Sequence, residues 1–298
     1  MSATTPDAVG PRTFAADEPD VVQPRRVRRP RAVALHIALA LGFVVMVMPF
    51  VWMVLSSFKT TREVRQSPPT WLPNDPTTEN YGDLFDRLDF PRYFLNSTVA
   101  ALAVTAGNLL FCSMLGYALA KLEFPGKRIL TGLMLGTLMV PAVVTFLPLF
   151  VIVANMNLTN TRWGLILPYL AGAFGAFLMR QFIVGIPNDL LDAARIDGAG
   201  EYRIFFRIVL PLCGPALATL AVLTFLGNWN SFLWPLVVAS SEEQYTLPVA
   251  LALFSRGQQE SNVALQMAGA TVVVIPVVVL FFAMQRFIIR GIATTGIK

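Results

Sequence analysis

The sequence predicts an all-α polytopic membrane protein with six transmembrane helices, and its composition and hydropathy pattern carry this prediction. Of its 298 residues, 55% are hydrophobic and only 14% are charged, whereas a soluble domain usually carries about 25% charged residues. The mean hydropathy of the chain is +0.61. Its apolar residues are gathered in long runs, and about 20 such residues suffice for a helix to cross the bilayer core. We therefore expect the lipid bilayer to surround most of the chain.

Six apolar runs are long enough to span a membrane, and we expect each to form one helix. They cover residues Val33–Leu55, Tyr93–Leu119, Ile129–Val153, Trp163–Ile183, Ile208–Val238 and Val263–Phe287. Pro49 is expected to kink the first helix, and Pro141 and Pro148 to break the regularity of the third, which membrane helices tolerate. Gly132 and Gly136 are spaced for close contact between helices.

Basic residues indicate the orientation of these helices, because they collect on the cytoplasmic side of a membrane. A run of arginines stands directly before the first span: Arg25, Arg26, Arg28, Arg29 and Arg31. Such a run can bind nucleic acid, but its place beside an apolar run favours a cytoplasmic anchor. We expect residues 1–31 to be a disordered basic cytoplasmic tail and residues 32–298 to form the transmembrane domain. Six spans then place both termini in the cytoplasm, at the inner (cytoplasmic) membrane.

The longest polar interruption in the C-terminal half lies between the fourth and fifth spans, at about residues 187–208. Asn188 or Asp189 can cap a short helix there, because a short polar side chain accepts from free N–H groups of the first turn. Gly198 can turn the chain, because glycine adopts a positive φ at little steric cost. The stretch therefore predicts a short helix, a glycine turn and a second short helix that leads into the fifth span.

This stretch resembles the cytoplasmic EAA loop of ABC importer inner-membrane permeases. The family pattern is Glu-Ala-Ala, three residues, Gly, nine residues, Ile, one residue and Leu-Pro. Six residues match it in register: Ala193, Ala194, Gly198, Ile208, Leu210 and Pro211. Asp192 stands where the family usually has Glu, which keeps the charge on a shorter arm. The extended form, with Asp197, Ala199 and Phe205, resembles carbohydrate-uptake (MalG-like) permeases. The alternative is an ordinary amphipathic connector between two spans.

The resemblance implies the type I permease fold and a role in importing a sugar or oligosaccharide. It also implies partners: a second permease subunit in a heterodimer, two cytoplasmic ATP-binding subunits, and an extracytoplasmic solute-binding protein. In such permeases the loop docks on the ATPase as a coupling helix, and the first external loop, here residues 59–92, helps to meet the binding protein.

Within the loop, the resemblance assigns roles to five residues. Asp192 and Asp197 are candidates for polar docking contacts, and Ala193 and Ala194 allow close approach. Gly198 sets the angle between the two short helices. Asp197 could equally cap the second short helix.

Catalytic chemistry finds little support in the sequence. No Gly-x-x-x-x-Gly-Lys-Ser/Thr phosphate loop occurs, and the single histidine, His36, leaves little for a Ser-His-Asp triad. Cys112 and Cys213 lie in or beside apolar runs, which does not favour a metal site. We expect this chain to be no enzyme and to bind neither a cofactor nor a metal, with ATP and Mg²⁺ used by partner subunits.

Polar residues inside two spans are candidates for the solute pathway. The fifth run contains Asn228, Trp229, Asn230 and Ser231, and the second contains Asn108. Buried amides and hydroxyls are costly unless they face protein or a water-filled cavity. Sugar hydroxyls need such neutral donors and acceptors, and an aromatic face suits a pyranose. The same residues could instead form hydrogen bonds between helices.

Three other functions remain as alternatives. An ABC importer for another solute, such as a glycerol phosphate, a polyamine or an amino acid, would share the loop. An ion-coupled secondary carrier would need ionisable residues within the membrane, and these are almost missing here. A membrane enzyme would need a catalytic constellation.

Overall fold

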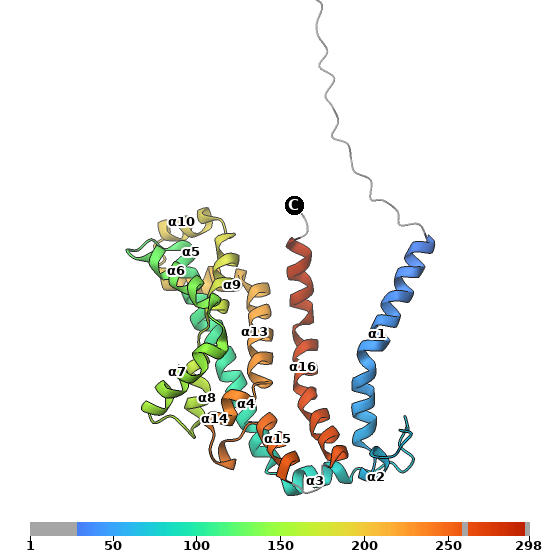
Figure 1. Ribbon diagram of the computed structural model, residues 1–298. Coiled ribbons are helices and arrows are strands. Elements are labelled where there is room, and N and C mark those ends of the chain that lie inside the picture. Colours follow the sequence, from blue (N-terminus) through green and yellow to red (C-terminus); the bar gives the residue numbers. More distant parts are fainter. Residues whose placement is uncertain (1–28, 258–261, 296–298) are drawn as a thin grey trace, which may run out of the picture. The chain divides into compact units, whose positions relative to one another are not determined.

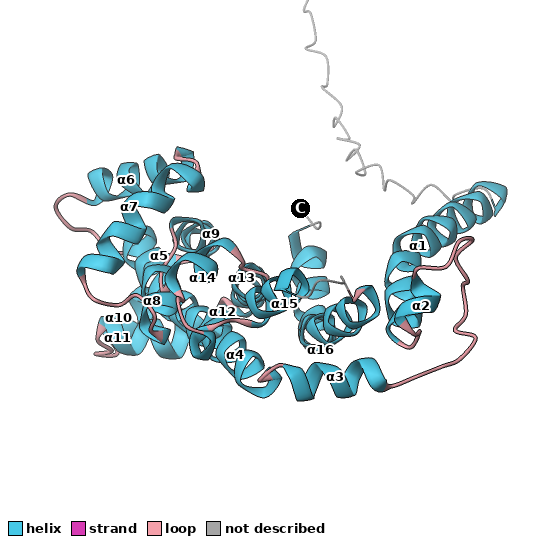
Figure 2. Ribbon diagram, turned by 60° about the horizontal axis from the view of Figure 1, so that its bottom comes forward, coloured by secondary structure: helices cyan, strands magenta, loops and turns pink. Residues whose placement is uncertain are grey.

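The computed structural model describes residues 29–257 and 262–295. Throughout these residues the secondary structure is helical, with no strand (Figure 2), so the all-α prediction is confirmed. The chain forms two compact units, Met1–Pro49 and Phe50–Lys298. Most of helix α1 (Arg29–Ser57) belongs to the first unit, and it continues through Pro49 without a break. Arg25, Arg26 and Arg28 of the predicted tail lie outside the described residues.

Four helical segments are long and apolar enough to cross a membrane: Val33–Ser57, Phe90–Lys121, Arg162–Val184 and Val263–Gln285. Two helix pairs meet the same criteria but are bent at a short break. The pair Lys127–Met139 and Ala142–Asn155 is bent by 108°, and the pair Glu201–Leu212 and Gly214–Trp229 by 80°. The described part of the chain therefore has six spans if each bent pair crosses once. The expectation that Ile129–Val153 and Ile208–Val238 are single helices is wrong.

Proline explains where the third run breaks. Helix α6 (Lys127–Met139) ends before Val140, whose backbone is extended, and Pro141 precedes α7 (Ala142–Asn155). A proline disfavours the helical conformation in the residue before it and donates no backbone hydrogen bond. The irregularity expected at Pro141 is therefore a complete change of direction, whereas Pro148 stays inside α7.

The fifth run is interrupted twice. The helical path through η3 (Phe205–Val209) and α12 (Leu210–Leu212) turns at Cys213 into α13 (Gly214–Trp229), where Pro215 occupies the first turn. The next helix, α14 (Leu233–Val238), begins only after Phe232.

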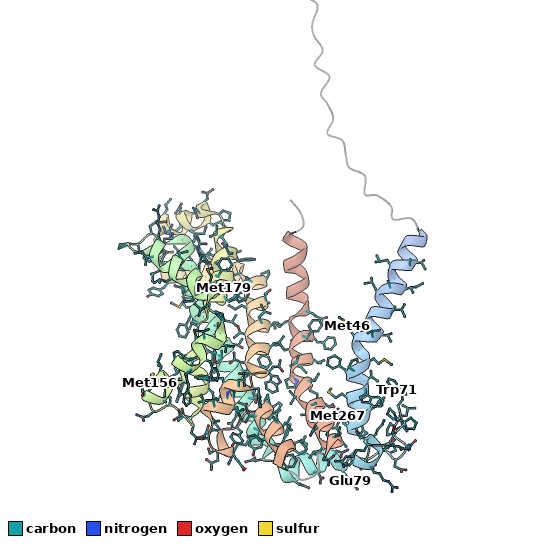
Figure 3. All side chains as sticks on the ribbon, in the orientation of Figure 1. Met46, Trp71, Glu79, Met156, Met179 and Met267 are labelled. Atoms are coloured by element: carbon teal, nitrogen blue, oxygen red, sulfur yellow. The ribbon has the colours of Figure 1, made fainter. Side chains whose placement is uncertain are left out.

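The second span is the centre of the larger unit. It consists of α4 (Phe90–Gly107), a π-helical turn η1 (Asn108–Cys112) and α5 (Ser113–Lys121). Its first part packs on α13, and its last part packs on α9 (Ala173–Val184). A Cβ added to Gly116 would lie 2.8 Å from the backbone nitrogen of Arg180, so α5 and α9 touch at backbone distance. Met179 is fully buried at this contact (Figure 3).

Gly132 and Gly136 make no such contact. A Cβ added at either position would meet nothing within 4 Å in the described residues. The prediction that this pair serves close helix contact is therefore wrong within this chain.

The two ends of the larger unit differ in structure. Helix α10 (Asn188–Ile196) lies at one end, and α3 (Glu79–Arg87) and α15 (Leu247–Gly257) lie at the other (Figure 1). At the α3 end, α16 (Val263–Thr295) packs on α3, on α15 and on the short α2 (Thr61–Val64). The short helices α8 (Arg162–Ile166), η2 (Leu167–Tyr169) and η4 (Glu242–Gln244) complete the unit, together with α11 (Glu201–Ile204) beside α10.

Residues 59–78 are folded, not merely turn-rich. The Glu63 carboxylate accepts hydrogen bonds from Thr70 Oγ1 and from the backbone N–H of Asn74, both at 2.9 Å. The Lys59 ammonium donates to the Thr70 carbonyl and lies 4.6 Å from the ring centroid of Trp52. The hydrogen bond from Asn74 is the main cause that holds the pKa of Glu63 below its usual value.

Candidate functional site

The polar stretch forms two short helices, α10 and α11, joined at a glycine turn. Gly198 has a φ of +79°, so the predicted turn is confirmed. Its N–H donates to the Arg195 carbonyl at 3.0 Å, and the N–H of Ala199 donates to the Ala194 carbonyl at 2.9 Å. These two bonds form a Schellman motif, which satisfies the last carbonyls of α10.

The cap predictions for these helices are wrong. Pro187 precedes α10, and no side chain caps it. Asn188 is already the first helical residue, and its Oδ1 accepts from Lys121 Nζ at 2.7 Å. Asp197 ends α10, and the residue before α11 is Gly200. Asp189 lies in the first turn of α10, where the helix dipole favours negative charge.

A chain of charged hydrogen bonds crosses the turn. Arg195 donates from its Nη1 to Asp192 Oδ1 at 2.7 Å and from its Nε to Glu201 Oε1 at 2.8 Å. The other oxygen of Glu201 accepts from the hydroxyl of Tyr117 in α5. The bond to Glu201 is the largest cause that raises the pKa of Arg195 above its ordinary value. Asp192 is thus paired within the chain, although its side chain is still 59% exposed.

Two apolar side chains of the stretch are strongly exposed, and the sequence pattern did not indicate them. Ile196 is 87% exposed and Tyr202 is 75% exposed, one on each side of the Gly198 turn. Leu191 is buried on the opposite face of α10 and holds it against the core. The available signal was an isoleucine placed directly before a polar turn, where no core position is expected.

The remaining residues of the motif lie in α10, in the turn after it, and in η3 and α12. Ala193 is exposed, whereas Ala194 and Ala199 are half-buried and pack against the core. Phe205 is buried, with its ring centroid 5.6 Å from that of Tyr117. Leu210 is half-buried in α12, beside the exposed Pro211.

The candidate pathway residues of the fifth run lie at the end of α13. Trp229 is 1% exposed, and its indole N–H donates to the Val273 carbonyl of α16 at 3.0 Å. Asn228 and Asn230 donate to carbonyls of the preceding turn, those of Thr224 and Leu226. Asn230 is exposed, whereas Asn228 and, at the break after α13, Ser231 are half-buried. Trp229 therefore has the interhelical role that the sequence left open.

Asn108 also bonds between helices. Its Nδ2 donates to the Tyr169 carbonyl at 2.6 Å and to the Val104 carbonyl at 3.1 Å. Its Oδ1 accepts from Cys112 Sγ at 3.3 Å. Both ends of this buried amide are thus satisfied by protein.

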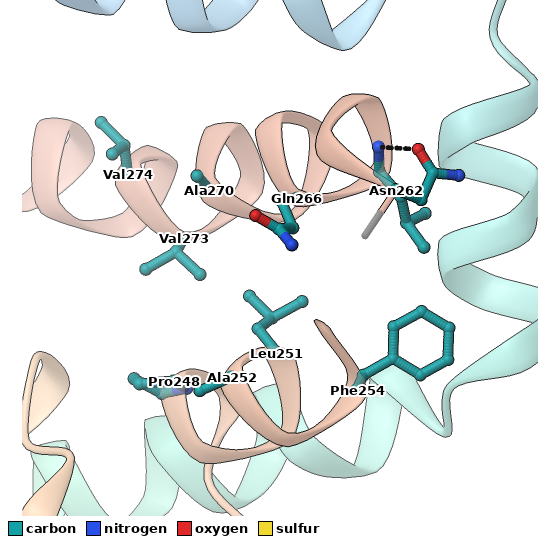
Figure 4. A pocket seen from close by; sticks show the side chains of 10 residues that line it. Pro248, Leu251, Ala252, Phe254, Asn262, Gln266, Ala270, Val273 and Val274 are labelled. Atoms are coloured by element: carbon teal, nitrogen blue, oxygen red, sulfur yellow. Dashed lines mark hydrogen bonds between the residues drawn. The ribbon is translucent and has the colours of Figure 1, made fainter. Parts of the chain in front are cut away.

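Two cavities adjoin these regions. One, of about 400 Å³, lies between α15 and α16, where Gln266 points from α16 towards α15 (Figure 4). Its lining is apolar except for Gln266 and Asn262. The other, of about 290 Å³, lies beside the loop and is lined by Met114, Tyr117, Ala118, Leu122, Glu201, Tyr202 and Phe205.

Comparison with known proteins identifies the family. Residues 112–294 match the family described as "Binding-protein-dependent transport system inner membrane component". The chain belongs to this family. The resemblance drawn from the loop is therefore confirmed, and this protein is a transporter permease, a class that is not itself catalytic.

Two relatives resemble the permease over nearly its whole length. It is 37% identical over 279 residues to the arabinooligosaccharides transport system permease protein AraQ of Halalkalibacterium halodurans, covering 91% of this chain and all of that one. It is 35% identical over 261 residues to the diacetylchitobiose uptake system permease protein NgcG of Streptomyces coelicolor, covering 87% and 86%.

A solved structure has the same fold. A chain in the crystal structure of a bacterial ABC transporter involved in the import of the acidic polysaccharide alginate matches with a TM-score of 0.76 and 25% identity. The match covers 89% of this permease and 99% of that chain. The expected ABC importer permease fold is therefore confirmed.

Proposed function

We propose that this permease translocates a sugar or oligosaccharide that an extracytoplasmic solute-binding protein delivers. The observation that carries the proposal is the similarity, over about nine-tenths of the chain, to two permeases named for the transport of oligosaccharides. The neutral amides of Asn228 and Asn230 suit this class of solute, because sugar hydroxyls both donate and accept hydrogen bonds. In this proposal Asn228, Asn230 and Ser231 contact the solute, whereas Trp229 and Asn108 hold the helices around it.

The energy for transport comes from separate subunits. The proposed assembly contains a second permease in a heterodimer and two cytoplasmic ATP-binding subunits, which use ATP and Mg²⁺. The α10–α11 loop docks on an ATP-binding subunit. Ile196 and Tyr202 supply apolar contact there, and Asp192 and Asp197 supply polar contacts at the rim. Such a partner would explain the exposure of Ile196, because burying its aliphatic side chain on docking would contribute about 1.5–3 kcal/mol to the free energy of binding.

The orientation follows from charge. Lys121, Lys127, Arg195 and Arg203 belong to the end that carries α10, whereas Glu242 and Glu243 belong to η4 in the loop after α14. Basic residues favour the cytoplasmic side. We therefore place α10 in the cytoplasm, with both termini on the same side of the inner membrane.

A second candidate solute is a glycerol phosphate. The chain is 34% identical over 272 residues to the sn-glycerol-3-phosphate transport system permease protein UgpE of Yersinia pestis. A phosphate dianion would favour a cationic side chain, and the pathway candidates named above are all neutral.

Stimulated ATPase activity separates the two candidates. The complete complex is reconstituted and its ATPase activity is measured with binding proteins loaded with oligosaccharides or with sn-glycerol 3-phosphate. Stimulation by an oligosaccharide-loaded protein is the expected result. Stimulation by the phosphate ester alone would reject the carbohydrate proposal and keep the importer function.

A further inference from the structure

Hydrogen bonds from Tyr117 and Lys121 connect the loop to α5, a helix that is not its neighbour in the chain. The bond from Tyr117 continues through two further side-chain bonds within the loop. The loop continues directly from α9 and leads directly into α12 and α13. Tyr117, however, belongs to α5 and lies 84 residues before Glu201, whose carboxylate accepts its hydroxyl proton. Through Arg195 the connection continues to Asp192 in α10. The second span is thereby attached to both short helices of the loop.

The chemistry of this connection makes it strong and directional. Glu201 accepts a neutral O–H on one oxygen and a guanidinium N–H on the other, and hydrogen bonds to ionised groups are shorter and stronger than neutral ones. Tyr117 is 4% exposed, whereas the side chain of Glu201 is 42% exposed. The buried tyrosine is therefore the fixed end of the connection, and the carboxylate belongs to the loop.

A cavity adjoins this contact on one side. The cavity of about 290 Å³ is lined by both partners of the bond, Tyr117 and Glu201, and by Tyr202. On the other side of the contact, Ile204 of α11 is fully buried and the Phe205 ring lies 5.6 Å from that of Tyr117. The hydrogen bond therefore acts together with this packing to set the position of α11 against α5.

Both helices carry a π-helical turn near the contact. The turn η1 lies in the same span as Tyr117, and η3 directly follows α11. Such turns are frequent at functional sites, since they interrupt the regular hydrogen-bond ladder. The α4 part of the second span also packs on α13, the helix that carries Asn228.

We propose that Tyr117 is a positioning residue that, through Glu201 and Arg195, transmits movement of the coupling loop to the span Phe90–Lys121. The inference rests on the proposed function, because it assumes that an ATP-binding subunit moves the loop. The loop is covalently continuous with α9 on one side and with α12 and α13 on the other. The bond to Tyr117 would move α5 together with them.

The test measures coupling in the complete reconstituted complex, as solute transported per ATP hydrolysed. This ratio does not depend on how many complexes fold. Tyr117→Phe keeps the ring against Phe205 and removes only the hydroxyl. We expect a roughly tenfold lower ratio, the factor that corresponds to the loss of one hydrogen bond to a charged group. The matched control is Tyr169→Phe, because the described residues offer the Tyr169 hydroxyl no hydrogen bond.

A double variant shows whether the residues act as one connection. Glu201→Gln should lower the ratio as well, and Tyr117→Phe with Glu201→Gln should lower it no further than the more severe single variant. A normal ratio in Tyr117→Phe, an equal loss in Tyr169→Phe, or fully additive losses would overturn the inference. A wild-type complex without binding-protein-stimulated ATPase activity would instead reject the proposed function, so the two failures are distinguishable.

Discussion

At the residue scale, backbone conformations were easier to predict from the sequence than the hydrogen-bond partners of side chains. The positive φ of Gly198 followed from a glycine placed after a short amphipathic helix, because local sterics decide this conformation. The partners of Glu201 were not predictable, since Arg195 lies across the turn from it and Tyr117 lies 84 residues away. Trp229 shows the same limit. The sequence identified a polar aromatic group within an apolar run, but only the fold shows that its N–H meets Val273.

Gly198 tests the turn. Gly198→Pro should leave membrane insertion intact and abolish transport, because proline fixes φ near −65° and removes the N–H that bonds to the Arg195 carbonyl. Uptake into membrane vesicles measures the effect. The matched control is Gly200→Ala, since Gly200 has a φ of −73° and open space for a Cβ. Wild-type uptake by Gly198→Pro would contradict the role of the turn.

Trp229 and Asn230 separate a structural residue from a pathway residue. Trp229→Ala should destabilise the permease by about 3–5 kcal/mol, because it empties a fully buried site. Asn230→Ala, at an exposed position, should leave the melting temperature unchanged and lower the rate of solute uptake. Thermal unfolding in detergent and uptake are measured for both variants. The assignment fails if Trp229→Ala melts like the wild type, or if Asn230→Ala transports normally.

At the element scale, the apolar runs predicted where helices occur but not how they bend. Hydropathy predicts that a segment lies in the membrane, but it gives almost no information on the direction in which the helix runs there. Pro141 indicated an irregular third span, yet the 108° bend depends on how α6 and α7 pack on different neighbours. The glycine pair Gly132 and Gly136 shows the converse error. Its spacing is common, whereas Gly116, which has no second glycine four residues away, lies at a backbone contact.

Gly116 tests that contact. Within a bilayer, helix association depends on close van der Waals packing, because lipid is as apolar as the side chains. Gly116→Val should therefore separate α5 from α9 and destabilise the permease by about 1–3 kcal/mol, the usual cost of overpacking. Gly132→Val, where a Cβ has open space, is the control. Equal melting temperatures for the two variants would show that the α5–α9 contact is not close.

The folded segment of residues 59–78 should respond to pH through Glu63. Its pKa lies below the usual 4.5, so the ionised carboxylate stabilises the folded loop above that pH, and the contribution is lost as pH falls through the lower folded-state pKa. Pepsin should therefore cleave residues 66–78 of the wild type faster as pH decreases below about 4.5. Glu63→Gln should show little of this dependence, whereas Glu79→Gln, at an exposed position, should behave like the wild type. An identical pH profile for Glu63→Gln and the wild type would contradict the role of this carboxylate.

At the scale of the whole molecule, the membrane class and the permease family were predictable because both depend on patterns in the sequence itself. Composition and run length fixed the membrane class, and six spaced loop residues indicated the permease family. The positions of side chains within the site were harder to predict from the sequence. The exposed Ile196 and Tyr202 and the connection from Tyr117 to Glu201 arise only when three helices meet, and no local pattern encodes that meeting.

In the proposed function this chain forms part of the membrane pathway of an ATP-driven importer and has no energy source of its own. The most direct measurement is uptake of labelled oligosaccharide into proteoliposomes that contain the permease pair, with and without the ATP-binding subunits and ATP. Uptake that requires ATP, the ATP-binding subunits and the loaded binding protein together is the predicted result. Uptake by the permease alone, driven by an ion gradient, would contradict the proposed function.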